Sequence, residues 1–125
     1  MDTVTSPDAD RRQRHERYDC SEGCPVEAAL ELIGGKWKGL ALYHLMDATG
    51  PLRFNELKRH LRNVTQRTLT KQLRELEADG LISREVFPVV PPKVEYRLTQ
   101  RGESLRAIIM ALRAWGHEHA LPPRA

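Results

Sequence analysis

Apolar residues recur with a helical period over residues 64–81, in the middle of the chain. The apolar positions at i, i+4 and i+7 are Leu69, Leu73 and Leu76. On a helix of about 3.6 residues per turn these side chains form one stripe. Thr65 is placed to cap the amino end with its hydroxyl, and Gly80 is placed to stop the helix in a left-handed conformation. The segment is therefore predicted to be a helix with a defined start and end.

The same period predicts three helices that precede this central helix. The first begins at Pro25, because the missing N–H of proline would be unpaired at the first helical position anyway. It ends at Gly34-Gly35, and a second helix follows over residues 36–48, with a third over residues 55–61. The expected buried faces are Val26, Ala29, Leu30 and Ile33 on the first helix, Trp37, Leu40, Ala41 and Leu45 on the second, and Leu57 and Leu61 on the third.

Alternation of apolar and polar residues predicts a β-hairpin after the central helix. Residues 81–87 and 94–98 both alternate as half-buried strands do. The residues expected on one face of the second strand are Val94, Tyr96 and Leu98. The loop between the strands reads PVVPPK, and its three prolines remove amide donors and stiffen the backbone. We therefore expect a semi-rigid projecting tip, and we expect one further short strand at residues 52–54.

The order of these elements predicts the fold. A third helix, a turn of a few residues, the central helix and a hairpin form the arrangement of a winged helix-turn-helix. The predicted fold class is mainly α with a small β-hairpin wing, dimerising through terminal helices. The predicted domains are a flexible polar arm over residues 1–19, a winged helix-turn-helix DNA-binding domain over 20–98, a dimerisation helix over 99–120 and a tail over 121–125.

A last helix, capped by Thr99 and running to about His119, carries a second apolar stripe. Its positions at helical spacing are Leu105, Ile108, Ile109, Leu112 and Trp115. Three helices and a hairpin already supply the core of so small a domain, so we expect this stripe to meet a second copy of the chain. The alternative is that it packs onto the first helix of its own chain.

The composition fits one small soluble domain. Of the 125 residues, 40% are hydrophobic and 30% are charged, which is enough for a modest core. No apolar run approaches the roughly 18 residues of a membrane span, and the amino terminus lacks the hydrophobic core of a signal peptide. We therefore expect a cytoplasmic protein with no membrane partner.

The positive charge is concentrated in one block of the chain. Residues 53–74 contain seven basic residues and one acidic residue, a net charge of +6, whereas the whole chain carries +3. Such a local surplus is typical of a surface that meets a polyanion. The basic arm at residues 11–17 is a further candidate for phosphate contact, with an ordinary solvated tail as the alternative.

A helix that reads DNA needs an apolar back, small polar residues near the bases and long cations for the phosphates, and residues 64–81 offer all three. The amino-terminal turns of such helices enter the major groove first. The candidate base contacts are Gln66, Arg67, Thr68 and Lys71. The candidate backbone contacts are Arg53, Lys58, Arg59, Arg62, Thr70, Arg74 and Lys93. For any single residue, the alternative is an ordinary solvated charge.

The acidic residues of the central helix occupy the wrong end for helix stability. The basic residues crowd its first turns, whereas Glu75, Glu77 and Asp79 lie in its last turns, opposite to what the helix dipole favours. We infer that something other than helix stability placed these charges.

Cys24 is a second candidate for chemistry. A thiol at a helix amino terminus lies beside unpaired N–H groups and the positive end of the dipole, which favours the thiolate and its oxidation or alkylation. Cys20, one helical turn upstream, is a candidate to resolve a sulfenic acid or to pair across a dimer. The alternative is an unreactive capping cysteine.

A zinc site is disfavoured, and no metal or cofactor is expected. The two cysteines are spaced Cys-x3-Cys without a second pair, and the candidate partners are His15, His117 and His119. His117 and His119 are two positions apart on the last helix and point to different sides.

Several short segments of the chain match those of one known family. They are Cys24-Pro25-Val26, Gly35-Lys36-Trp37, residues 53–57, 69–73, 76–81 and 91–96, and Trp115-Gly116. Through these segments the chain resembles, over about residues 20–119, the HxlR-type bacterial transcription regulators, dimeric winged-helix proteins related to the MarR group. The resemblance implies a homodimer on double-stranded DNA with an inverted-repeat operator. It also implies a wing near the minor groove and control of a neighbouring operon, most often by repression. Several members of this family respond to oxidants or electrophiles through the cysteine that matches Cys24.

Three classes of function remain open. The first is a DNA-binding regulator switched at Cys24. The second is a regulator gated by a small effector, such as an aromatic compound, that binds non-covalently between the dimer helix and the DNA-binding core, with Cys24 silent. The third is a winged helix that binds protein. An enzyme is not expected, because the sequence shows no paired carboxylates, no nucleophile and base at a recognisable spacing, and no phosphate-binding glycine loop.

Overall fold

The structure is a computed structural model that describes residues 23–122. The predicted arm over residues 1–19, Cys20, and residues 123–125 of the predicted tail lie outside the described residues. The chain divides into two compact units, one ending at Gly34 and one beginning at Gly35. Each unit is described by itself below.

The described part of the first unit contains one helix, α2 (Pro25–Ile33), with Cys24 as its N-cap and Pro25 at its first position, as predicted. The predicted buried face is wrong for two of its residues. Ile33 is buried, but Val26 and Leu30 are exposed. The period correctly identifies an apolar face, but an apolar face is buried only where other residues cover it.

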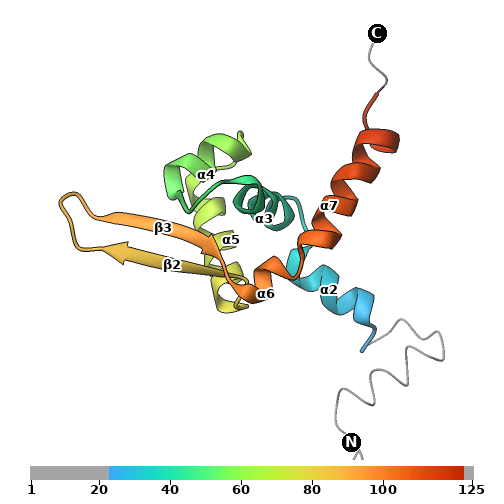
Figure 1. Ribbon diagram of the computed structural model, residues 1–125, viewed down its shortest axis with the longest axis horizontal. Helices are drawn as coiled ribbons and strands as arrows, with labels where there is room; N and C mark the ends of the chain where they lie inside the picture. The colour runs from blue at the N-terminus through green and yellow to red at the C-terminus, as the bar shows by residue number, and fades with distance from the viewer. Residues whose placement is uncertain (1–22, 123–125) are drawn as a thin grey trace, which may run out of the picture. The chain divides into compact units, whose positions relative to one another are not determined.

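The second unit is mostly helical with one small sheet (Figure 1). Its elements are α3 (Trp37–Asp47), β1 (Leu52–Arg53), α4 (Phe54–Leu61), α5 (Gln66–Ala78), β2 (Ile82–Phe87), β3 (Lys93–Leu98), α6 (Gln100–Glu103), α7 (Arg106–Trp115) and a π-helical turn η1 (Gly116–Ala120). The predicted fold, mainly α with a small β-hairpin wing, is confirmed, and dimerisation through the terminal helices stays a prediction. In Figure 1 the β2–β3 hairpin extends away from the group formed by α3, α4 and α5.

The core of the second unit lies between α3, α4 and α5. The side chains that are almost completely buried include Leu42, Leu57, Leu69, Leu73, Leu76 and Leu81. The predicted stripes of α4 and α5 are confirmed, because Leu57, Leu61 and the three leucines of α5 are all buried. These two helices have polar residues on their other sides, so the period selects one face without ambiguity.

The predicted face of α3 is only half right. Ala41 and Leu45 are buried as expected, but Leu40 is exposed and Trp37 is half-buried, while Leu42 and Met46 are buried in their place. Apolar residues surround most of this helix, so its sequence does not define which side faces the core.

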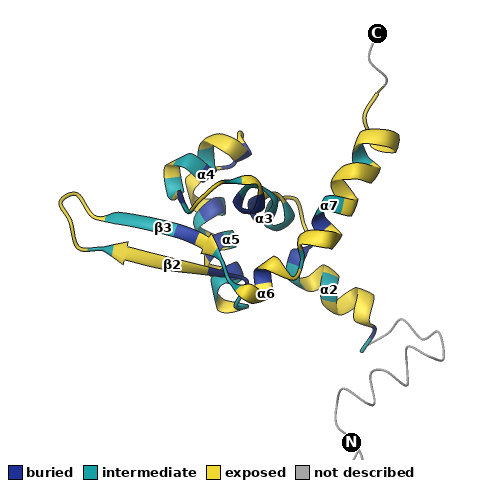
Figure 2. Ribbon diagram, in the orientation of Figure 1, coloured by how far each residue is buried: buried dark blue, intermediate teal, exposed yellow. Residues whose placement is uncertain are grey.

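The three strands form an antiparallel sheet in the order β1-β3-β2. Leu52 of β1 pairs with Tyr96 of β3, and Ile82 of β2 pairs with Leu98. Burial is confined to the base of the hairpin, where Ile82 and Tyr96 are buried, whereas Val86 farther out is exposed. Figure 2 shows β2 mostly exposed beyond its base and the hairpin tip exposed, whereas the outer part of β3 is intermediate. The expected alternation of burial therefore fails in β2, because that strand extends beyond the core.

The last predicted helix is interrupted. Thr99 caps the short helix α6, where its hydroxyl accepts the N–H of Gly102 at 3.0 Å. The Ser104 N–H is shared between the Gln100 and Arg101 carbonyls, the Leu105 N–H bonds the carbonyl of Gly102 three residues earlier, and α7 begins only at Arg106. The prediction of one continuous helix is therefore wrong. The apolar spacing is unchanged by such a local tightening, so it could not reveal the break.

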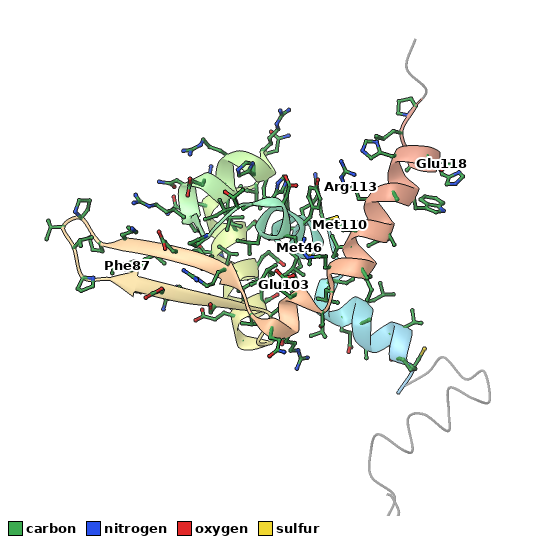
Figure 3. All side chains as sticks on the ribbon, in the orientation of Figure 1. Met46, Phe87, Glu103, Met110, Arg113 and Glu118 are labelled. Atoms are coloured by element: carbon green, nitrogen blue, oxygen red, sulfur yellow. The ribbon has the colours of Figure 1, made fainter. Side chains whose placement is uncertain are left out.

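Helix α7 packs on α3 along part of its length. The Arg113 Nε donates to the Tyr43 hydroxyl at 3.0 Å, and an Nη of Arg106 donates to the Met46 carbonyl at 3.4 Å. Figure 3 shows Met46, Met110 and Arg113 where these two helices meet. Among residues 23–122, no helix is both long enough and apolar enough to cross a membrane.

Candidate nucleic-acid interface

The turn between α4 and α5 defines where the central helix begins. Arg62 and Asn63 both have positive φ, and Val64, which follows them, is buried. The Thr65 hydroxyl then accepts the N–H of Thr68 at 3.0 Å, so it caps α5 as predicted. At the other end Gly80 has φ +77, the left-handed conformation that was expected. Helices α4 and α5 therefore form a helix-turn-helix.

The polar side of α5 is exposed opposite its buried leucines. A shallow depression runs along it, lined by Gln66, Arg67, Thr70, Lys71, Arg74 and Glu75. Three of the four candidate base contacts lie here. The fourth, Thr68, is half-buried on the flank of the helix. The Thr70 hydroxyl donates to the Gln66 carbonyl at 2.8 Å, so its proton is used within the helix.

A second depression brings other candidate phosphate contacts together. Arg53, Arg59 and Lys93 line it, with residues from the start of α4 and from β3. The backbone N–H of Arg53 donates to a carboxylate oxygen of Glu56 at 2.8 Å, which holds the first turn of α4. Lys58, half-buried, and Arg62, exposed, do not line this depression. These candidate phosphate contacts therefore come from several elements, β1, α4 and β3.

Lys93 is engaged with its own hairpin. Its Nζ lies 3.4 Å from a Glu95 carboxylate oxygen and 4.7 Å from the centre of the Phe87 ring, whose place on the hairpin Figure 3 labels. A cation in this position is attracted by the ring face and by the carboxylate. The charge that Lys93 presents to a polyanion is therefore partly compensated.

Two acidic residues of α5 form ion pairs with neighbouring elements. The Lys38 Nζ of α3 lies 2.9 Å from the Glu75 carboxylate, and the Arg84 Nε of β2 lies 3.6 Å from the Glu77 carboxylate. The hydrogen bond from Lys38 lowers the pKa of Glu75. Sequence analysis missed Lys38. The available signal was the placement of acidic residues at the end of α5 that the helix dipole disfavours.

A histidine pair joins α3 to α4. The His44 and His60 rings stack with their centres 5.1 Å apart, and Tyr43 meets His44 edge to face at 5.2 Å. Asp47 and Glu56 line the same hollow. Burial lowers the pKa of His44, the nearby His60 lowers it further, and Asp47 opposes both. The neutral form of His44 is therefore favoured in the folded protein.

Cys24 is 2% exposed at the start of α2, so its thiol is shielded from reagents in this conformation. Cys20 and His15 lie outside the described residues. His117 and His119 are exposed on η1, and the His119 ring lies 5.1 Å from the Trp115 ring. Within residues 23–122, no three His, Cys, Asp or Glu side chains are grouped so that they could hold a metal ion.

The five residues predicted to meet a second copy of the chain differ in burial. Ile109 is 4% exposed, so it belongs to the core of its own chain, and Leu105 is half-buried. Ile108, Leu112 and Trp115 are exposed, with Trp115 at 61%. Figure 2 shows that most of α7 is exposed. Three apolar side chains on this helix are therefore available to a partner.

Residues 32–123 match the family model described as HxlR-like helix-turn-helix. The chain belongs to this family. Among its relatives, the HTH-type transcriptional regulator YybR of Bacillus subtilis is 54% identical over 102 residues, which cover 82% of this chain and 80% of YybR. This HxlR-like chain is thus a transcriptional regulator with a helix-turn-helix DNA-binding domain.

Solved structures of similar regulators share the fold. The redox regulator HypR in its oxidised form is 54% identical, with a TM-score of 0.73 over 77% of this chain and 97% of HypR. The reduced form of the transcriptional regulator YodB from B. subtilis is 37% identical, with a TM-score of 0.67 over 81% of this chain and 98% of YodB. The winged-helix architecture of the second unit is therefore that of known regulators.

Proposed function

We propose that this HxlR-like chain is a homodimeric, sequence-specific repressor of a nearby operon. The observation that carries the proposal is the polar face of α5, where Arg67, Lys71 and Arg74 are exposed opposite a completely buried leucine stripe. A helix docked in this way presents its outer side to the major groove. Double-stranded DNA is the polyanion that fits this surface.

The contacts are divided by their position along the helix. Gln66, Arg67, Thr68 and Lys71 lie in its first two turns and read base edges, with Thr68 at the edge of the surface. Arg74 contacts phosphates from the same helix, and Thr70 does so once its hydroxyl is released from the Gln66 carbonyl. The flanking backbone contacts are Arg53, Lys58, Arg59, Arg62 and Lys93. Base contacts specify sequence, whereas phosphate contacts fix register and orientation.

A homodimer is supported by the apolar side chains that α7 leaves exposed. Ile108, Leu112 and Trp115 lie at i, i+4 and i+7 and therefore share one helix face. In a two-fold dimer each α5 meets one half-site, so the operator is an inverted repeat with half-sites about one helical turn apart. Leu105 lies at the amino-terminal end of this face, and the buried Ile109 lies behind it in the core.

Regulation by oxidation of Cys24 is supported by a relative, since HypR is a redox regulator of which an oxidised form is known. In this chain, two thiols would lose two electrons and two protons to an added oxidant such as diamide and would join as a disulfide. The partner available to Cys24 is Cys20, within one chain or across a dimer. Because Cys24 is 2% exposed, the reaction requires a movement around the start of α2.

That burial favours a second candidate. A small aromatic or other hydrophobic effector would bind near the dimer interface and release DNA without thiol chemistry, and Cys24 would be structural. Such a ligand raises the melting temperature, because it binds the folded protein.

The decisive experiment is the selection of genomic DNA fragments by the purified protein, with and without diamide. The proposal expects an inverted repeat with the stated spacing and its loss on oxidation. Recovery of fragments without a common sequence contradicts a sequence-specific regulator. The Cys24→Ser variant is the control for the switch, and loss of DNA by this variant on oxidation removes Cys24 from the mechanism.

A further inference from the structure

The carboxyl-terminal half of α5 is held on two sides by ion pairs. Glu75 is paired with Lys38 of α3, and Glu77 is paired with Arg84 of β2. Residues two apart on a helix are separated by about 200° around its axis, so the two carboxylates lie on opposite flanks. The pairs therefore oppose rotation of α5 about its axis in either direction.

The exposed basic side of the helix lies between these two flanks. Arg67, Lys71 and Arg74 occupy the arc between Glu75 and Glu77 that faces away from the buried leucines. A rotation of α5 would move all three cations together relative to a bound duplex. Base readout depends on hydrogen-bond geometry, whereas phosphate attraction tolerates displacement.

The Lys38–Glu75 pair is the shorter of the two, and its cation is the more buried. The Lys38 and Glu75 ions are 2.9 Å apart and the Lys38 side chain is 14% exposed, whereas the Arg84 and Glu77 ions are 3.6 Å apart and the Arg84 side chain is 45% exposed. A close, partly buried pair is less screened by water and salt. Lys38 belongs to α3, whose buried residues fix this helix in the core, so Lys38 can hold the Glu75 side chain in a fixed position.

Glu75 also lines the depression that contains the cations of α5. An uncompensated carboxylate at this position would repel DNA phosphates. Lys38 compensates its charge and holds its side chain against α3. Both effects act on recognition through α5, and neither requires Lys38 to touch DNA.

We propose that Lys38 and Glu75 are positioning residues that set the rotation of α5 and thereby the sequence preference of the protein. The inference rests on the proposed function, in which α5 reads the operator. It explains why acidic residues occur at the end of α5 that the helix dipole disfavours. Glu75 and Glu77 are anchors to neighbouring elements, not contributors to helix stability.

The inference predicts an effect opposite in sign to simple electrostatics. Glu75→Gln removes a negative charge from the DNA-facing side, so charge alone predicts tighter binding to every duplex. A positioning role instead predicts weaker binding to the operator, with binding to random-sequence DNA unchanged or tighter. The ratio of the two affinities therefore separates the explanations.

The test measures dissociation constants by fluorescence anisotropy for an operator duplex selected from genomic fragments and for a random duplex of the same length. We expect Glu75→Gln and Lys38→Gln each to lower the operator preference by about fivefold, within the range that a misaligned base contact costs. The double variant should lose no more than the more affected single variant, because both residues act through one pair. Lys38→Arg should retain the preference.

Glu85→Gln is the matched control, because it removes one exposed carboxylate from β2 of the same domain. It should change both affinities by the same factor. Circular dichroism confirms folding, and if Glu75→Gln fails to fold, Glu77→Gln tests the other flank and should lower the preference in the same direction. An unchanged preference in the folded variant overturns the inference. A wild-type protein without any operator preference overturns the proposed function itself.

Discussion

The cap of α5 allows a prediction about stability and DNA binding together. The Thr65 hydroxyl accepts the N–H of Thr68 at 3.0 Å, and this hydrogen bond helps to hold the turn that carries Gln66 and Arg67. Replacing a capping threonine by alanine costs about 1 kcal/mol. Thr65→Ala should therefore lower the free energy of unfolding by about 1 kcal/mol, which corresponds to roughly 4–8 °C in melting temperature for a domain of this size.

The same variant should lose more in operator binding than in stability. Without its cap, the first turn of α5 is ordered less often, and the proposed base contacts of that turn must be ordered again on binding. Urea unfolding followed by circular dichroism gives the stability, and fluorescence anisotropy gives the affinity. Thr65→Ser keeps the oxygen and is the matched control. Equal stability of Thr65→Ala and the wild type would refute the assignment of this cap.

Four further predictions follow from the site. Arg67→Ala should weaken operator binding by about 1–3 kcal/mol and relax base preference, and equal losses on operator and random DNA would contradict base reading. Arg59→Ala should weaken binding to all sequences and reduce the salt dependence by about one unit of slope, whereas an unchanged slope would remove it from the phosphate contacts. The pKa of His44 is lowered in the folded state, so the folded protein binds fewer protons there and stability should fall as the pH drops below about 6.5. Urea unfolding at two pH values should show a smaller difference in His44→Gln, and an equal difference would show that His44 is not responsible. Trp115→Glu should shift sedimentation toward a monomer with little loss of helix content, because this side chain is 61% exposed within one chain; an unchanged sedimentation coefficient would exclude Trp115 from the dimer interface.

The sequence by itself determined α5 almost completely. Its cap at Thr65, its buried leucines and its left-handed stop at Gly80 are local features, and each appears in the structure where it was predicted. The reason is that capping, helical periodicity and positive φ depend on residues within a few positions of one another. The basic face of the helix was likewise visible in the order of residues alone.

Local sequence patterns did not predict which residues are buried where burial depends on another element of the fold packing over them. The sequence could not select the buried side of α3, which is apolar around most of its circumference, or show that Leu30 of α2 is exposed. It also did not show the interruption at Ser104 and Leu105, because a tighter turn leaves the apolar spacing intact.

Only the tertiary structure explains why acidic residues occur in the last turns of α5. Glu75 and Glu77 contradict the preference of the helix dipole, and nothing near them in sequence explains why. Their partners, Lys38 and Arg84, come from α3 and β2, and only the packing of these elements against α5 brings the charges together. Coulomb attraction depends on distance in space and not on separation along the chain, so the anchors of α5 could be recognised only in the folded protein.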